Sequence, residues 1–218
     1  RIRKGLSTEL FHRKGKELLR RLEALEQITP LDASRPRILE GDARDLERAL
    51  QQRPPADLIL TSPPYGGTYD YVEHHALRYP WLGLDPSRFE RDEIGARRRL
   101  QDETAQRRWD AELLAVLESM ERVLAPEGTI VLLIGDAQLG TKRVSAREQI
   151  RRLAPKARLW LLAAASQPRE DRRGFEPREE HLLLLRRPTG PRPKAPPPPR
   201  APRAPRAPRA PRAPKARG

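Results

Sequence analysis

A short apolar run in this chain is stopped by two consecutive prolines. In "DLILTSPPYGG", residues 58–60 are followed by Ser62-Pro63-Pro64-Tyr65. A residue that precedes proline is held in extended backbone, and both Ser62 and Pro63 precede one. The run therefore cannot turn into a helix, and we expect a buried β-strand that ends in an extended corner.

Apolar runs alternate with helical patterns along the chain. We expect strands at 37–39, 58–60 and 129–134, and helices at 43–51, 71–79, from Trp109 to a Pro126–Gly128 turn, and at 145–153. Continuous apolar runs between helices are typical of a parallel sheet that is covered on both faces, and this pattern predicts an α/β fold. Two more strands, at 159–165 and 181–185, have no helix between them, which predicts an antiparallel pair at one edge of the sheet.

Both ends of the chain differ from its middle. We expect residues 1–29 to form a basic amphipathic helix, residues 30–187 the folded α/β part, and residues 188–218 a disordered tail. The tail repeats Arg-Ala-Pro, and polyproline II geometry would space its arginines about 9 Å apart along one side. Arg203, Arg206 and Arg209 are candidate phosphate contacts on this side; a solvated linker is the alternative.

Composition excludes several classes of site. The 218 residues carry a net charge of +14 and no cysteine, so disulfides, thiolate metal sites and cysteine nucleophiles are excluded within the chain. Its four histidines are scattered, and we expect no metal site. No apolar run has the length of a membrane span, so a cytoplasmic protein without a membrane partner is expected. The positive charge favours a nucleic-acid partner.

The extended corner offers hydrogen-bond acceptors beside an aromatic plane. Prolines have no N–H group, so the Ser62 hydroxyl and the carbonyls of Ser62 and Pro63 form an acceptor-rich edge. Tyr65 adds a flat apolar surface, and Gly66-Gly67 lets the backbone turn close to a ligand. Such a corner suits a planar ring that bears an amino group, and a base within a duplex would reach it only after flipping out. Tyr69 and Tyr71 follow closely and are candidate nucleic-acid contacts.

Thr61-Ser-Pro-Pro-Tyr65 resembles the catalytic motif of the amino-methyltransferases, which use S-adenosyl-L-methionine to methylate exocyclic nitrogens of bases. The serine form is most similar to cytosine-N4 DNA methyltransferases, with adenine-N6 enzymes next. "ILEGDARDL" resembles the third strand of their Rossmann-like class I fold and the turn after it, and "LAPEGTIVLLIGD" resembles the fifth strand. The last two expected strands resemble the terminal antiparallel hairpin, so the resemblance covers about residues 37 to 187 and a partial sheet.

The resemblance implies a role for each residue of the corner. Ser62 and the Pro63 carbonyl would hold the target amino group of a flipped DNA base, Pro64 would shape the turn, and Tyr65 would stack on the base. Methyl transfer would be direct, which agrees with the lack of a cysteine nucleophile. Gly41 and Asp42, after the expected third strand, would contact the adenine of S-adenosyl-L-methionine; a turn and helix cap is the alternative.

The chain departs from this family at the cofactor site. The glycine-rich turn after the first strand and the acidic residue after the second are both absent from the sequence. We expect these two strands to lie upstream of Arg1. Two alternatives therefore stay open: an RNA guanine-N2 methyltransferase, and a non-catalytic nucleic-acid-binding protein derived from a methyltransferase.

Overall fold

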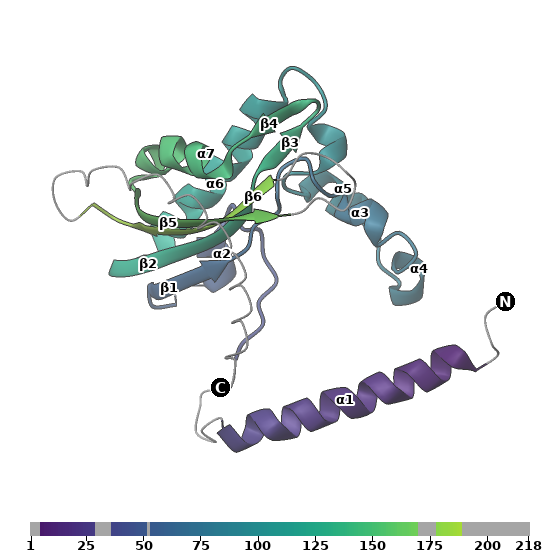
Figure 1. Ribbon diagram of the computed structural model, residues 1–218. Helices are drawn as coiled ribbons and strands as arrows, with labels where there is room; N and C mark the ends of the chain where they lie inside the picture. The colour runs from purple at the N-terminus through teal and green to yellow at the C-terminus, as the bar shows by residue number, and fades with distance from the viewer. Residues whose placement is uncertain (1–4, 29–35, 52, 170–177, 189–218) are drawn as a thin grey trace, which may run out of the picture. The chain divides into compact units, whose positions relative to one another are not determined.

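The computed structural model describes residues 5–28, 36–51, 53–169 and 178–188. The chain forms two compact units, residues 1–40 and 41–218 (Figure 1). Within the described ranges, no helix has the length and apolar character that crossing a membrane requires. The tail arginines Arg203, Arg206 and Arg209 lie outside the described residues.

The first unit contains one long helix, α1, which spans Leu6–Ile28 and confirms the predicted amphipathic helix. Glu17 forms ion pairs with Lys14 at 2.8 Å and Arg21 at 2.5 Å on its surface. The strand predicted at 37–39 is wrong: residues 36–40 form neither helix nor strand, and Ile38 is 97% exposed. A strand needs a hydrogen-bonded neighbour, and no strand of the described residues pairs with this segment.

The second unit is built on a mixed four-stranded sheet. Its strands are β1 (Ala56–Thr61), β2 (Leu124–Gly135), β5 (Trp160–Arg169) and β6 (Arg178–Arg186), in the spatial order β1-β2-β6-β5. β1 and β2 are parallel, whereas β6 is antiparallel to both of its neighbours. β6, the last of these four strands along the chain, is thus inserted between β2 and β5, which confirms the predicted antiparallel pair and places it at one edge.

The polar turn predicted between the long helix and the next strand lies within that strand. Helix α6 (Ala105–Val123) leads directly into β2 at Leu124. Ala56 pairs with Leu124 and Leu58 pairs with Thr129, so β2 uses three residues more than β1 over the same length. The Pro126–Gly128 segment is this irregularity, and a side chain at Gly128 would come within 2.8 Å of the Ala56 carbonyl oxygen.

Helices cover one face of the sheet. Besides α6, this face carries α7 (Ala146–Leu153), the short 3₁₀ helix η2 (Ala154–Ala157) and, against α6, α2 (Leu46–Leu50) (Figure 1). Ile59 and Ile130 are cross-strand partners whose side chains lie on this covered face. Side chains alternate between the two faces along each strand. On the opposite face Leu58 and Leu60 are 58% and 71% exposed. Within the described residues, the predicted cover on both faces is therefore present on one only, and no strand pairs with the outer edge of β1.

A segment of short helices follows the corner after β1. It contains α3 (Tyr71–His74), α4 (Tyr79–Leu82), α5 (Pro86–Asp92) and the 3₁₀ helix η1 (Arg97–Arg99). The single helix predicted at 71–79 is wrong, because Pro80 lies in the first turn of α4, where its missing N–H needs no partner. Residue type alone predicts a core position for both Trp81 and Trp109; Trp81 is 90% exposed, whereas Trp109 on α6 is buried.

A hairpin that sequence patterning did not predict follows β2. It consists of β3 (Ala137–Leu139) and β4 (Lys142–Val144), which are antiparallel. Three-residue strands are too short for alternation to reveal them. The hairpin is joined to the corner by the backbone amide of Gln138, which donates a hydrogen bond to the Gly66 carbonyl at 2.9 Å.

We predict that Gly67→Ala lowers the free energy of unfolding by about 3 kcal/mol or more. Gly67 has a φ of +69°, and an added Cβ would lie 1.6 Å from the Gln138 carbonyl oxygen. Gly83 is a matched control, because it has a φ of +63° with no atom within 4 Å of an added Cβ. Gly83→Ala should therefore cost only about 1 kcal/mol of backbone strain. Urea unfolding measures both, and equal losses would contradict the close approach at Gly67.

Candidate active site

The proline corner lies where two parallel strands end side by side. Ser62-Pro63-Pro64-Tyr65 directly follows β1, and the neighbouring β2 ends at Gly135. Because the two strands are parallel, their carboxyl ends lie at the same edge of the sheet, which is where open α/β sheets bind ligands. Ser62 is exposed, Pro63 is buried, and Pro64 and Tyr65 are half-buried. The four candidate catalytic residues thus form one continuous stretch with the serine at the surface.

Tyr65 is fixed by contacts from three strands. Its ring lies against Gly135, where an added Cβ would come within 2.7 Å of two ring carbons. Its hydroxyl donates a hydrogen bond of 2.5 Å to Oε1 of Glu180 on β6. The guanidinium carbon of Arg169 on β5 lies 5.5 Å from the ring centroid, which is within the range of a cation–π contact. The ring therefore has one defined position at the end of the sheet.

The hydrogen bond between Tyr65 and Glu180 moves the pKa values of the two groups apart. Burial, followed by the bond to Glu180, raises the pKa of Tyr65 to about 12. The bond from Tyr65 is also the main cause that lowers the pKa of Glu180, and Gln167 and Arg169 add to it from 3.2 and 3.4 Å. At neutral pH the phenol is a neutral donor and the carboxylate is charged, so Tyr65 is no general base here.

Glycines hold the backbone close to the core just beyond the corner. The Gly67 amide donates to the Gly95 carbonyl at 2.9 Å. Gly66 and Gly95 both lie against the buried ring of Trp109, where an added Cβ would come within 2.6 Å and 3.0 Å of it. The corner is therefore held between the β3–β4 hairpin and the segment before η1.

Buried charge fixes the start of the helical segment. Asp70 is buried and accepts hydrogen bonds from the Arg97 side chain at 3.1 Å and from the Arg98 amide at 2.9 Å. Tyr69 and Tyr71, the candidate nucleic-acid contacts, flank Asp70, and their ring centroids are 5.7 Å apart. The structure thus brings these two rings together just after the corner, while Arg97 and Arg98 are occupied by acidic partners.

A second polar cluster follows β2. Asp136 accepts hydrogen bonds from the Ala146 amide at 3.0 Å and the Glu179 amide at 3.3 Å, and its Oδ1 lies 3.0 Å from His181 Nε2. Burial alone would raise the pKa of Asp136, but these hydrogen bonds outweigh it and lower the pKa. His181 Nδ1 lies 2.8 Å from the Ser166 hydroxyl. Asp136, Glu179 and His181 have ligand atoms within 4.8 Å of one another, a spacing that a metal ion could use. We expected no metal site, and the hydrogen bonds give this cluster a structural role: it joins β2, β5, β6 and α7.

Gly41 and Asp42 lie in the turn before α2. The Asp42 carboxylate accepts from the Arg44 amide at 2.8 Å and from its guanidinium at 2.6 Å, and the side-chain bond is the main cause that lowers the pKa of Asp42. An added Cβ at Gly41 would lie 2.5 Å from the Ala49 Cβ. Asp45 caps α2 through its side chain. This arrangement matches a turn before a capped helix, and the cofactor contacts of Gly41 and Asp42 stay predictions.

Sequence reasoning missed Glu180, Arg169 and Gln167, the polar residues around the Tyr65 hydroxyl. They lie on the terminal hairpin, more than 100 residues beyond the corner along the chain. The only signal was that an antiparallel pair ends in polar residues. That signal could not show that β6 lies next to β2 and thereby brings Glu180 beside Tyr65.

We predict a phenolate titration step near pH 12 that is absent from Tyr65→Phe. Between the ordinary pKa of 10.0 and this value, the folded protein keeps a proton that the unfolded chain releases, so stability falls as pH rises through this window. Absorbance titration and thermal unfolding above pH 9.5 measure both effects.

Glu180→Gln is the matched variant for this titration. It keeps Tyr65 buried but removes the charged acceptor, so the Tyr65 step should move to lower pH. A wild-type protein whose tyrosines all ionise near pH 10 would contradict the bond between Tyr65 and Glu180.

Similarities to known proteins point to one family. A family model described as DNA methylase, of the N6 and N4 methyltransferases, matches residues 56–206. Type II methyltransferase M.MjaII of Methanocaldococcus jannaschii is 33% identical over 110 residues, which cover 45% of this chain and 20% of that protein. The chain thus spans about a fifth of the length of this relative.

Solved structures include TTHA0409 of Thermus thermophilus, assigned as a DNA modification methylase and solved with S-adenosyl-L-methionine. It aligns with a TM-score of 0.40 and 21% identity over 71% of this chain and 56% of that one. The family model extends over more than half of the sequence and begins at the first residue of β1. This chain belongs to the DNA methylase family.

Proposed function

We propose that this chain holds the target base of a DNA methyltransferase that uses S-adenosyl-L-methionine. The acceptor would be the exocyclic amino group of a flipped base, cytosine N4 first and adenine N6 second. The observation that carries the proposal is the exposed Ser62, presented beside the immobilised Tyr65 at the carboxyl ends of two parallel strands. Membership of the DNA methylase family supports the substrate class.

The corner can bind both hydrogens of an amino group. Pro63 and Pro64 have no N–H, and we assign the Ser62 hydroxyl oxygen and the Pro63 carbonyl as the two acceptors. Two acceptors that bind both hydrogens of an amino group orient the lone pair of its nitrogen away from the ring plane. This positioning is the contribution that we assign to Ser62 and Pro63.

Tyr65 would bind the plane of the same base. Its ring cannot swing away, because Gly135 supports it and Glu180 holds its hydroxyl. Arg169 lies beside the ring and is half-exposed, so its long side chain could move as a base arrives. A fixed aromatic plane stacks on a flipped base without an ordering cost at the moment of binding.

The described residues form only part of a cofactor site. S-adenosyl-L-methionine supplies, when bound, the electrophilic methyl group of this reaction. The Asp42 carboxylate is occupied by Arg44, and the described residues contain no glycine-rich turn. We therefore propose that most of the cofactor site is contributed by residues other than those described, and we assign the chain's own residues to the base.

Replacing Ser62 by alanine tests the proposal. We expect Ser62→Ala to lower the rate of methyl transfer to DNA about a hundredfold, because it removes one of the two acceptors that position the amino group. The measurement is transfer of labelled methyl groups from S-adenosyl-L-methionine to DNA by the full natural polypeptide. Pre-steady-state single turnovers separate this step from product release.

Thr141→Ala is the control, since it also deletes one hydroxyl but lies in the turn between β3 and β4. It should leave the rate unchanged. Undiminished transfer by Ser62→Ala would contradict the proposal. Transfer to RNA but not to DNA would support the guanine-N2 alternative, and no transfer by the wild type would support the non-catalytic one.

A further inference from the structure

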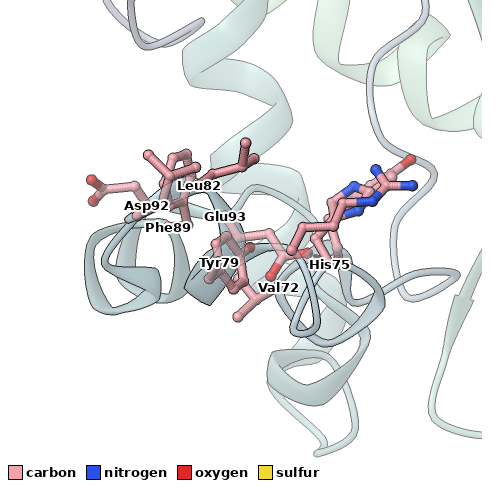
Figure 2. A pocket seen from close by; sticks show the side chains of 10 residues that line it. Val72, His75, Tyr79, Leu82, Phe89, Asp92 and Glu93 are labelled. Carbon is pink, nitrogen blue, oxygen red and sulfur yellow. Dashed lines mark hydrogen bonds between the residues drawn. The ribbon is translucent and has the colours of Figure 1, made fainter.

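A cavity of about 410 Å³ lies within the helical segment that follows the corner. Figure 2 shows it between α3, α4 and α5, with Val72 from α3, His75 just after α3, Tyr79 and Leu82 from α4, and Phe89 from α5. Its volume lies in the range of small-molecule sites, about 300–1,000 Å³. None of the residues proposed to hold the target base lines it.

The lining contains two pairs of flat rings. Tyr71 and His75 are stacked, with ring centroids 6.4 Å apart and an angle of 26° between their planes. Tyr79 and Phe89 are stacked as well, at 6.0 Å and 25°. Tyr71 and Phe89 remain about half-exposed, so part of their ring surface is open to a ligand. Two aromatic pairs at one cavity favour a planar ring as the occupant.

One polar atom among the residues that line the cavity has no hydrogen-bond partner. His75 Nδ1 is buried and makes no hydrogen bond, and such an atom is costly unless a ligand or water completes it. A purely apolar occupant would leave it unsatisfied. A heteroaromatic ring with N–H or ring-nitrogen groups could stack on the aromatic side chains and bond to His75 Nδ1 once the imidazole turns toward it, because this atom is covered in the structure.

The charges around the cavity suit a base rather than a phosphate. Arg98 binds Glu93 at 2.6 Å, and the Tyr71 amide donates to the same carboxylate at 2.5 Å. Asp92 also lines the cavity, and its half-exposed carboxylate lies 4.0 Å from Arg88. Carboxylates accept hydrogen bonds from the amino groups of bases and repel phosphates. Arg78 also lines the cavity, and its guanidinium could bind a phosphate of a nucleic-acid strand.

We propose that this cavity binds a second, unstacked nucleobase of the same strand, next to the target base. The inference rests on the proposed function, because it assumes a nucleic-acid substrate. It follows from the aromatic planes, the unpaired His75 nitrogen and the direct continuity of the segment with the corner: Tyr71 is six residues beyond Tyr65, and Asp70 between them is anchored to Arg97 and Arg98. Contacts to a neighbouring base would add sequence preference to that of the corner.

Photocrosslinking tests the occupant directly. The probes are single-stranded oligodeoxynucleotides that carry one 5-iodouracil at successive positions. We expect crosslinks to Tyr71, His75, Tyr79 or Phe89, identified by mass spectrometry of the peptides. Crosslinks confined to other segments of the chain would overturn the inference.

Affinity variants separate a base from an aliphatic occupant. Phe89→Leu keeps apolar volume but removes a ring, and we expect it to weaken oligonucleotide binding about tenfold, as measured by fluorescence anisotropy. Phe89→Tyr keeps the ring and should bind like the wild type, which also controls for folding. His75→Ala tests the unpaired nitrogen independently and should weaken binding as well. Leu77→Ala, exposed and not part of the lining, should have no effect. Wild-type affinity of both Phe89→Leu and His75→Ala would overturn the inference.

Ser62→Ala distinguishes a failure of this inference from a failure of the proposed function. It should lower methylation about a hundredfold but leave the crosslinks to the cavity residues in place. If the wild type methylates DNA and both Phe89→Leu and His75→Ala bind normally, the second base site is wrong and the proposed function stands. If the crosslinks form but no variant or wild type methylates, the proposed function is wrong and the binding site stands.

Discussion

The contact between the Tyr65 ring and Gly135 is the constraint on which the rest of the candidate site depends. β1 and β2 are parallel, so their carboxyl ends meet, but only the missing side chain at position 135 lets an aromatic ring lie across the end of β2. From that position the Tyr65 hydroxyl donates a hydrogen bond to Glu180 on β6, the strand next to β2. The corner after β1, the end of β2 and the terminal hairpin are thereby held together, and Ser62 is presented at one defined place.

Features that depend on local chemistry could be predicted from the sequence. The prolines after Thr61 predicted an extended corner at the end of a strand, and the structure has β1 end there. The apolar run at 129–134 and the terminal pair of strands also appear, as parts of β2, β5 and β6. In each case a residue's own backbone preference, or a continuous apolar run, was enough to determine the local structure.

Features that depend on distant neighbours could not be predicted. Residues 37–39 have a strand-like composition, but no described strand pairs with them. Trp81 is exposed because the short helices around it form their own cavity rather than joining the core. The bond from Tyr65 to Glu180 requires the order β1-β2-β6-β5, which no local pattern contains. The uncovered face of β1, with Leu58 and Leu60 exposed, is likewise a property of the assembled sheet: parallel strands normally have both faces covered.

The most direct test of the account is the identity of the methylated nucleoside. The full natural polypeptide would be incubated with S-adenosyl-L-methionine and with DNA or RNA, and the digested nucleosides identified by mass spectrometry against standards. A corner that binds an amino group, in a chain without cysteine, predicts N4-methyldeoxycytidine, or N6-methyldeoxyadenosine, from DNA. Methylation at carbon 5 of cytosine, or a product found only in RNA, would contradict the assignment of Ser62 and Pro63 as the residues that hold the amino group of a DNA base.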